Sequence, residues 1–271
     1  MFMLDEILAH KIIEVEDKKV RYPMSLVEKK LAHARSVRDF FDAMKQPGIS
    51  LIAEVKRKSP SKGELRQDYD ALSLARTYSQ HGARAISVLA DEAFFGGGAH
   101  IVERIANDAQ VHLPVMYKEF VIDPYQVFEA RSVGADAVLL IVRAVAPAML
   151  PQLIETAHQL GMQALVECFT VEEAKLAVGS GARIVGVNNR DLQSFEVDLE
   201  RSEKIRAVLP STTLTVSESG LSSRADALQA EQLGFDAMLV GEAILKADNV
   251  ALQVRSFAGL HEEMKDPVLN D

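Results

Sequence analysis

The sequence lacks the features that a secreted or membrane-spanning protein needs. Its 271 residues include one cysteine, Cys168, so neither an internal disulfide framework nor a cysteine-based metal cluster can form. The longest apolar run, Ala137 to Val142, is too short to span a bilayer. Acidic residues at positions 5 and 6 and the lack of a sustained apolar core exclude a secretory signal. We therefore expect a cytoplasmic protein with no membrane partner.

Positive charge is also scarce. The chain has 30 lysine and arginine residues against 39 aspartate and glutamate residues, which gives a net charge of −9 at pH 7. So acidic a chain has little non-specific attraction for nucleic acid, and we expect no nucleic-acid partner. A basic cluster in this chain is therefore local and suits a small anionic ligand.

Low-complexity tracts and linkers rich in proline, glycine or serine are absent, whereas the hydrophobic fraction of 48% is ordinary for a globular protein. We predict one domain over residues 1–271, made of a helical extension (1–48), a barrel (49–260) and a C-terminal tail (261–271).

The N-terminal extension has apolar residues at helical spacing. Leu4, Ile7 and Ile12 predict a first helix, and a second helical pattern runs from about 25 to 41, after Pro23. We expect these helices to pack over one end of the domain, in preference to contacting a ligand.

From Leu51 onward the chain repeats a unit of helix, glycine and short apolar strand, at intervals of roughly 20 to 35 residues. In four units a glycine is placed to end the helix in the left-handed conformation. The predicted strands are Leu51–Val55, Ala85–Leu89, Pro114–Lys118, Val138–Ile141, Gln163–Glu167, Ile184–Val187, Leu214–Glu218 and Met238–Gly241. Eight apolar strands alternating with helices predict an α/β fold, a (β/α)8 TIM barrel with additional N-terminal helices.

Polar residues gather at the predicted C-terminal strand ends, where TIM barrels have their active sites. Glu54 and Lys56 alternate in the first strand, so their side chains point to the same face. A structural ion pair at the barrel mouth explains those two residues about as well as a catalytic pair does. The other polar strand ends carry Lys118, Glu167, Asn188, Arg190, Glu218 and Ser219. A convergent set of this kind can transfer protons and hold an anion.

The loops after the seventh and eighth strands contain Ser219-Gly220 and Gly241-Glu242. Barrel enzymes often bind phosphate there, on backbone N–H groups, so we predict a phosphate site. The seven histidines lie away from the polar strand ends without zinc-binding spacing, and we predict no metal site. Cys168 follows the inward-pointing Glu167, so we expect a buried thiol and not a nucleophile.

Several motifs together resemble the indole-3-glycerol phosphate synthase family of tryptophan biosynthesis. They are LIAEVKRKSPSKG (51–63), LPVMYKEFVIDPYQV (113–127), GADAVLLIV, LVE ending at Glu167, VGVNNRDLQSFEVDL (185–199), SESGL and LVGEAIL. The similarity keeps the same order over nearly the whole chain and includes the helices ahead of the barrel.

The resemblance implies a lyase that needs no cofactor. Its substrate is 1-(2-carboxyphenylamino)-1-deoxyribulose 5-phosphate, which undergoes ring closure, decarboxylation and dehydration to indole-3-glycerol phosphate. The implied partner is this phosphorylated small molecule, and the resemblance says nothing of association with other enzymes of the pathway.

The resemblance also implies roles for individual residues. Lys118 matches the general acid, and an ammonium near another cation such as Lys56 can have its pKa lowered toward a useful range. Lys56 matches the lysine that binds the benzoate carboxylate, and Glu54 and Glu167 match carboxylates of deprotonation and dehydration. Residues matching the substrate site are Asn188, Arg190, Glu218 and Ser219, with Phe95, Phe120 and Leu139 as apolar walls for the aryl ring. Residues matching the phosphate site are Ser59, Gly220, Gly241 and Glu242, and we expect the loop that carries Ser59 to be mobile over the substrate.

The chain departs from the family pattern in three places. Ala90 replaces a more usual threonine, Tyr117-Lys118-Glu119 replaces Arg-Lys-Asp, and Cys168-Phe169 replaces Val-His. We expect Tyr117 to face the helices, and Ala90 and Glu119 to affect loop positions and hence rate. Two alternatives stay open: another phosphate-binding barrel, such as a sugar-phosphate isomerase or epimerase, and a non-catalytic paralogue that binds a related phosphate.

Overall fold

A computed structural model of the chain describes residues 3–60, 62–190 and 200–260. The predicted tail and the part of the VGVNNRDLQSFEVDL motif that follows Arg190 lie outside these ranges. The strands are β1 (Ser50–Val55), β2 (Lys58–Ser59), β3 (Gly63–Glu64), β4 (Ala85–Leu89), β5 (Val115–Lys118), β6 (Ala137–Ile141), β7 (Gln163–Cys168), β8 (Ile184–Asn188), β9 (Leu214–Glu218) and β10 (Ala237–Val240).

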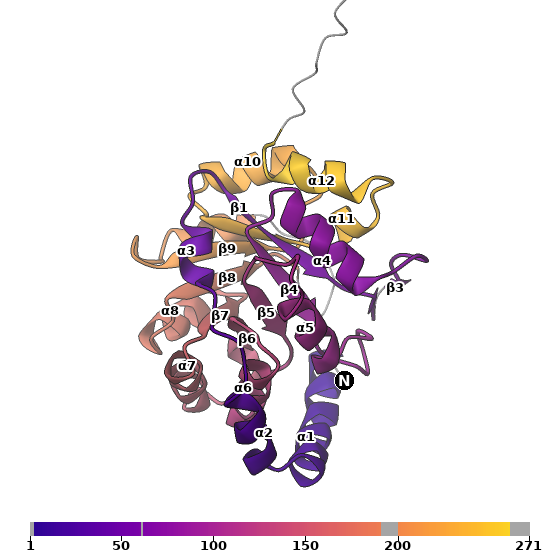
Figure 1. The fold of residues 1–271 in the computed structure, drawn as a ribbon. Coiled ribbons are helices and arrows are strands. Elements are labelled where there is room, and N and C mark those ends of the chain that lie inside the picture. The colour runs from indigo at the N-terminus through magenta and orange to yellow at the C-terminus, as the bar shows by residue number, and fades with distance from the viewer. Residues whose placement is uncertain (1–2, 61, 191–199, 261–271) are drawn as a thin grey trace, which may run out of the picture.

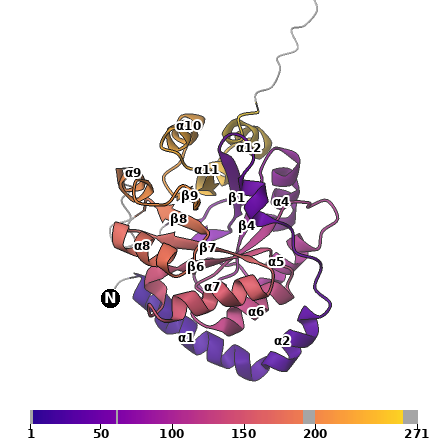
Figure 2. The same ribbon diagram turned by 90° about the vertical axis from the view of Figure 1, so that its left-hand side faces the viewer.

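Helices alternate with these strands and surround them (Figure 1, Figure 2). The helices are α1 (Met3–Arg21), α2 (Met24–Leu31), α3 (Phe40–Met44), α4 (Ala71–Gln80), α5 (Ala99–Ala106), α6 (Pro124–Ser132), the 3-10 turn η1 (Val142–Ala144), α7 (Met149–Gln159), α8 (Val171–Gly179), α9 (Glu200–Arg206), α10 (Arg224–Gln232), α11 (Glu242–Leu245) and α12 (Val250–Phe257).

The eight longer strands close into a parallel barrel in the order β1-β10-β9-β8-β7-β6-β5-β4. This confirms the predicted TIM barrel, and each predicted strand overlaps an observed one. The predicted helix-ending glycines all have positive φ, as the left-handed conformation requires: Gly82, Gly134, Gly181 and Gly234.

Two apolar layers hold the barrel together. Met116 and Leu165 belong to the cluster inside it, one layer below Lys118 and Glu167, as the period of two predicts. Phe40 of α3 joins the same cluster. The outward-facing strand residues pack against the surrounding helices in a second, larger cluster. The inner cluster therefore fills the barrel, and the polar strand ends lie at its mouth.

The second N-terminal helix is shorter than predicted. Instead of continuing from 25 to 41, α2 ends at Leu31, and α3 begins at Phe40 after an irregular stretch. In this stretch the N–H of Arg38 donates to Asp136 Oδ1 at 2.7 Å, and the Arg35 guanidinium donates to Asp136 Oδ2 at 2.5 Å. This buried carboxylate at the start of β6 overrides the helical pattern of the local sequence.

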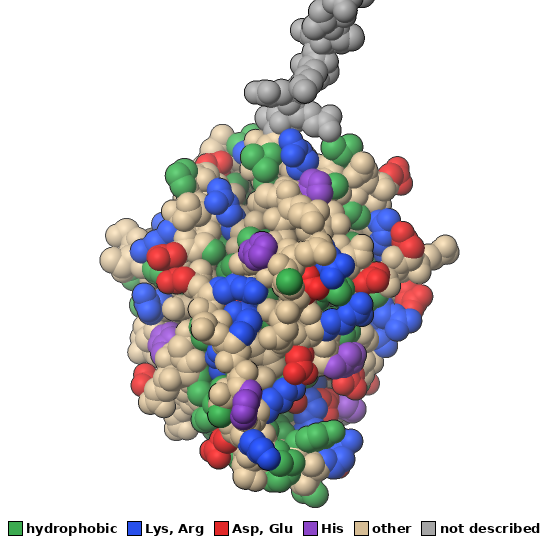
Figure 3. Space-filling model, viewed as in Figure 1, with side chains coloured by type: hydrophobic (Ala, Val, Ile, Leu, Met, Phe, Trp, Pro, Cys, Tyr) green, Lys and Arg blue, Asp and Glu red, His purple; other side chains and the backbone are tan. Residues whose placement is uncertain are grey.

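Two further features complete the fold. The loop after β1, predicted without regular structure, forms a short antiparallel hairpin in which β2 pairs with β3. Helices α1 and α2 lie together along the α6 side of the barrel (Figure 1). In the described residues no helix is long and apolar enough to cross a membrane. Basic and acidic side chains are interspersed on the face that Figure 3 draws.

Candidate active site

A pocket opens at the C-terminal ends of the barrel strands. The structure brings every predicted site residue to its lining: Glu54, Lys56, Ser59, Phe95, Lys118, Phe120, Leu139, Glu167, Asn188, Arg190, Glu218, Ser219, Gly220, Gly241 and Glu242. They come from β1, β5, β6, β7, β8 and β9, from the β2–β3 hairpin, and from the segments that follow β1, β4, β5, β8, β9 and β10. Parallel strands in one barrel present their carboxyl ends to the same mouth, which explains the convergence.

Glu54 is the centre of the ionic contacts in the pocket. Its Oε1 lies 2.5 Å from Lys56 Nζ, and its Oε2 accepts a hydrogen bond from Lys118 Nζ at 2.7 Å. Burial alone would raise the pKa of Glu54, but the two ammonium groups outweigh it and lower the pKa to about 2. Glu54 is therefore a permanent carboxylate that holds two lysines in fixed positions.

Lys118 is more basic than the sequence indicated. Burial favours its neutral form, but the carboxylates of Glu54, Glu218 and Glu167 outweigh burial and raise its pKa above the ordinary value. The lowering considered for a neighbour of Lys56 is therefore wrong, because the nearest charges to Lys118 are negative. Its Nζ lies 3.9 Å from Glu218 Oε2 as well as 2.7 Å from Glu54. At neutral pH the group is an ammonium surrounded by carboxylates.

Glu167 and Glu218 form a second, contrasting pair. Burial raises the pKa of both carboxyl groups, and the negative charge of Glu167 raises that of Glu218 further. Both carboxyls are less than a twentieth exposed. Unlike Glu54, this pair keeps a proton to higher pH than ordinary carboxyl groups do, which suits it to accept and return a proton.

Two glycines in or next to the strands leave room for these carboxylates. A Cβ added to Gly186 in β8 would lie 2.1 Å from Glu218 Oε1, and one added to Gly241 would lie 2.5 Å from Glu54 Oε1. Any larger residue would displace the acid that it faces. Gly186 was not predicted as a site residue, because Glu218, which it contacts in the fold, is distant in sequence.

The apolar part of the lining contains more than the predicted walls. The rings of Phe95 and Phe120 lie with centroids 6.0 Å apart. Met3, Leu4 and Ile7 of α1 also line the pocket, although the N-terminal helix was predicted only to pack over one end of the domain. That expectation was incomplete, since helical spacing identifies the buried face of α1 but not what it contacts.

The predicted phosphate end contains backbone in an unusual conformation. Ser219 has φ of 67° and Gly220 has φ of 79°, so both lie in the left-handed region. The buried side chain of Asn189 donates to the Ser219 carbonyl at 3.1 Å and to Ser217 Oγ at 3.2 Å. Asn189 was not predicted to hold this loop, because the sequence does not show that its side chain is buried.

The hairpin and the β10 end approach each other beside this loop. Lys62 Nζ lies 2.5 Å from Glu242 Oε1, and Lys246 Nζ lies 2.8 Å from the same oxygen. Burial alone would raise the pKa of Glu242, but the two ammonium groups together outweigh it and lower the pKa to about 2. Ser59 and Gly241 line the pocket, and the ion pair between Lys62 and Glu242 joins the hairpin to the start of α11.

The residues that depart from the family pattern have defined positions. The Tyr117 hydroxyl donates to Glu129 of α6 at 2.9 Å, which confirms that it faces the helices. Cys168 is buried against the Gly186 carbonyl, and burial raises the pKa of its thiol. Phe169 stacks under the Arg143 guanidinium at 3.9 Å. In the described part of the chain, no group of His, Cys, Asp and Glu has the geometry to hold a metal ion.

Comparisons with known proteins show which family the chain resembles. The family model for indole-3-glycerol phosphate synthase matches residues 4–257. The indole-3-glycerol phosphate synthase of Roseiflexus castenholzii is 47% identical over 264 residues, which cover 95% of this chain and 98% of the relative. That of Dehalococcoides mccartyi strain CBDB1 is 42% identical over 255 residues, 93% of this chain and 98% of the relative.

Solved structures of lower similarity share the barrel. The 3-hexulose-6-phosphate synthase from Salmonella typhimurium superimposes with a TM-score of 0.64 at 16% identity, over 78% of this chain and 98% of that chain. This likeness concerns the fold alone. The extent and identity of the sequence matches establish more: the chain belongs to the indole-3-glycerol phosphate synthase family.

Proposed function

We propose that the chain converts 1-(2-carboxyphenylamino)-1-deoxyribulose 5-phosphate to indole-3-glycerol phosphate, carbon dioxide and water. It is a carboxy-lyase of tryptophan biosynthesis, as its family membership implies. The observation that carries the proposal is the contact of Glu54 with both Lys56 and Lys118, in a pocket that also contains Glu167. A purely structural ion pair needs no second lysine at the pocket surface.

The pocket lining offers partners for both anionic groups of the substrate. Gly220 and Gly241, in the loops after β9 and β10, offer backbone N–H groups to the phosphate, and Ser59 offers a hydroxyl. Lys56 offers an ammonium to the benzoate carboxylate. The aryl ring then lies between Phe95, Phe120 and Leu139, which is the apolar part of the lining.

Ring closure requires a proton at the substrate ketone. The electron-rich aryl carbon attacks the carbonyl carbon, a carbon–carbon bond forms, and the carbonyl oxygen takes a proton from Lys118. The oxygen of an alkoxide is more basic than an amine, so even a lysine with a raised pKa gives up its proton to it. The carboxylates around Lys118 also stabilise its charged form before the reaction begins.

Decarboxylation follows without an external electron acceptor. Ring closure leaves an iminium group beside the carbon that bears the carboxylate. When the bond to the carboxylate breaks, its electron pair moves into the iminium, and carbon dioxide leaves. Lys56 must release the carboxylate at this step, and its strong contact with Glu54, at 2.5 Å, provides an alternative partner for the ammonium.

Dehydration completes the indole ring, and the two carboxylates divide the work by their proton affinities. A ring carbon gives its proton to a carboxylate, the bond to the neighbouring hydroxyl breaks, and the Lys56 ammonium, free of the departed carboxylate, supplies the proton that turns the hydroxyl into water. Glu167, whose pKa is raised by burial, is suited to take that proton, whereas Glu54 has a pKa of about 2 and stays ionised. We assign proton transfer to Glu167 and the positioning of both lysines to Glu54.

The substrate is a phosphorylated small molecule, and we propose that the protein acts in the cytoplasm, with no nucleic-acid or membrane partner. The net charge of −9 supports the absence of a nucleic-acid partner.

The test adds synthetic carboxyphenylamino-deoxyribulose phosphate to the purified chain and follows indole fluorescence, with product mass as a second readout. We expect stoichiometric indole-3-glycerol phosphate. Binding without any product, at high protein concentration, would favour a non-catalytic paralogue. Turnover of pentose phosphates in its place would favour a sugar-phosphate isomerase or epimerase.

A further inference from the structure

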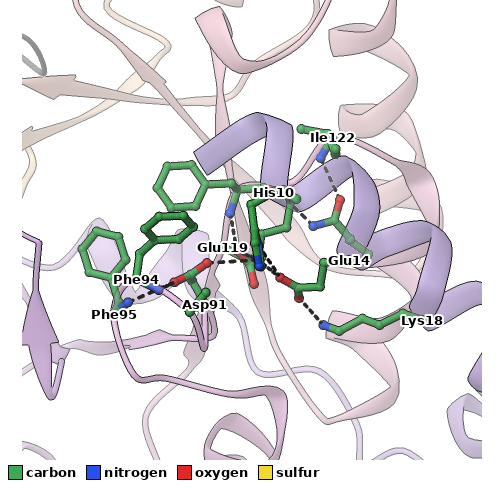
Figure 4. Close-up of polar contacts among 12 residues, drawn as sticks. His10, Glu14, Lys18, Asp91, Phe94, Phe95, Glu119 and Ile122 are labelled. Carbon is green, nitrogen blue, oxygen red and sulfur yellow. Dashed lines mark hydrogen bonds and ion pairs between the residues drawn. The ribbon is translucent and has the colours of Figure 1, made fainter. Parts of the chain in front are cut away.

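A buried ionic cluster beside the pocket connects the N-terminal helix to the barrel, and one of its members, Glu119, also belongs to the pocket lining. Lys11 of α1 is fully buried, and its Nζ lies 2.8 Å from Glu14, 3.1 Å from Asp91 and 3.0 Å from Glu119. Asp91 follows β4 and Glu119 follows β5. Figure 4 shows Asp91 and Glu119 turned toward α1, with Glu14 on the helix beside them. One ammonium thus joins α1 to two loops at the barrel mouth.

The two loop carboxylates also hold the backbone of the aryl wall. Asp91 Oδ1 accepts hydrogen bonds from the N–H groups of Phe94, at 2.7 Å, and Phe95, at 3.0 Å. Glu119 Oε1 accepts one from the N–H of Phe120 at 2.7 Å. Phe95 and Phe120 are the aromatic residues of the pocket lining. The backbone N–H of each therefore donates directly to a carboxylate that contacts Lys11.

The helix that carries Lys11 also contributes side chains to the pocket. Ile7, one turn before Lys11 on the same face, lines the pocket together with Met3 and Leu4. His10, the neighbour of Lys11, packs edge-on against Phe94 with ring centroids 5.5 Å apart. The position of α1 therefore fixes a further part of the apolar lining. Lys11 connects that part to the two phenylalanine loops, which are the segments after β4 and β5 that carry Phe95 and Phe120.

The burial of Lys11 calls for an explanation. Ile7, Lys11 and Val15 are the buried residues of α1, so the ammonium takes a core-facing position where an aliphatic side chain would pack without desolvation. Removing one partner of such a buried cluster leaves uncompensated charge. Without Lys11, Asp91 and Glu119 would lose the ammonium that joins them to α1, and both loops would be free to shift.

We propose that Lys11 is a positioning residue that holds Phe95 and Phe120 against helix α1 and so sets the affinity of the pocket for the aryl ring of its substrate. The inference rests on the proposed function for the identity of that ring. It assigns Lys11 no contact with substrate. We expect its effect on the aryl ring and not on the phosphate, because the hydrogen bonds and ion pairs of the cluster within the described residues join α1 to the loops after β4 and β5.

The test compares Lys11→Met with Lys18→Met in the full chain. Lys18 lies on the same helix and anchors it to Glu14 and to Glu129 of α6, at 3.1 and 3.4 Å, but touches neither phenylalanine loop. Calorimetry measures the binding of two ligands: the substrate analogue with its ketone reduced to an alcohol, which keeps the aryl ring, and glycerol 3-phosphate, which has only the phosphate end.

We expect Lys11→Met to weaken the binding of the reduced analogue by about tenfold or more, the size expected for a misplaced apolar wall. Binding of glycerol 3-phosphate should change by less than about twofold, and Lys18→Met should leave both affinities within about twofold. Thermal unfolding of both variants reports any general loss of stability. If Lys11→Met does not fold, Lys11→Gln, which keeps a donor without the charge, takes its place with the same expected split.

Equal weakening of both ligands, or equal effects of Lys11→Met and Lys18→Met, would overturn the inference. The proposed function fails separately, if the unmodified chain produces no indole-3-glycerol phosphate. Because the affinities are measured without turnover, the two failures are distinguishable.

Discussion

At the scale of single residues, Lys118 is the side chain on which turnover should depend most. Replacing it in Lys118→Met keeps the length of the side chain but removes the proton for ring closure. We expect turnover to fall by roughly 10² to 10⁴-fold, the usual contribution of a general acid, while substrate affinity changes little. Single-turnover indole fluorescence measures the first quantity, and titration of the reduced analogue measures the second.

Lys58→Met is the matched control for that experiment. Lys58 also lies at the pocket mouth, but its Nζ donates to the Ala93 carbonyl at 3.2 Å and the side chain is not part of the lining. Its loss should leave turnover within a few-fold of normal. A Lys118→Met protein that keeps most of its activity would contradict the general-acid assignment.

Glu119 should make the stability of the protein depend on pH. Burial raises its pKa from 4.5 to about 7, with Lys11 opposing and Asp91 adding to the shift. Between these values the folded protein holds a proton that the unfolded chain has released, so the free energy of unfolding falls as pH rises. At about 1.4 kcal/mol per pH unit, the difference between the two pKa values corresponds to a total loss of about 3.5 kcal/mol, to order of magnitude.

Urea unfolding at about pH 5 and about pH 8 measures this dependence. The stability of the unmodified protein should fall over this interval relative to that of Glu119→Gln, which cannot ionise. The exposed Glu92→Gln variant should follow the unmodified protein. Parallel pH dependence in all three proteins would show that Glu119 titrates in the folded state as it does in the unfolded chain.

The polar residues at the strand ends could be predicted one by one from the sequence. Their pKa values could not, because these depend on charged partners from other strands. Alternation in the strands predicts that Glu54 and Lys56 point the same way, and the structure confirms it. The pKa of Lys118 depends on Glu54, Glu167 and Glu218, which come from three other strands. Lys11 was overlooked for the same reason, because its partners lie far along the chain.

At the scale of helices and strands, the connection between α2 and α3 should be held by Asp136. This fully buried carboxylate binds the Arg35 side chain and accepts from the N–H groups of Arg38 and Val115, at 2.7 and 2.8 Å. Removing it in Asp136→Ala leaves three donors without their acceptor. We expect the free energy of unfolding to fall by about 3 kcal/mol or more.

Urea unfolding tests that loss, and kinetics give the contrast. Asp136 precedes β6, at the end of the barrel opposite the pocket, so kcat of the folded variant should be close to normal. Asp17→Ala removes a surface ion pair of α1 with Arg21 and should change the stability little. An Asp136→Ala protein as stable as the Asp17→Ala protein would show that the connection is held by other contacts.

The elements themselves were largely predictable. Strands buried on both faces appear as short apolar runs, and the glycines that end helices mark where each begins. The break after Leu31 was missed because Asp136, which causes it, lies about a hundred residues later in the sequence. The β2–β3 hairpin was missed because two residues in each strand give no alternation to detect.

At the scale of the whole molecule, fold and site follow from one property of the barrel. Parallel strands bring their carboxyl ends to one mouth, so a sequence with eight apolar strands and polar ends defines a pocket without knowledge of any contact within it. The N-terminal helix is the exception, because it contributes lining from outside the repeat. Its position is a property of the packed molecule, set by Lys11 and by α6.

The proposed reaction closes the indole ring and then releases the carboxylate as carbon dioxide. The ratio of carbon dioxide to indole-3-glycerol phosphate measures both steps together. The purified chain is given substrate labelled with carbon-14 in the benzoate carboxylate, and released carbon dioxide and indole-3-glycerol phosphate are counted in the same sample. We expect one carbon dioxide for each indole ring, at every time point after the first turnover. Release of carbon dioxide without indole, or unchanged substrate, would contradict it.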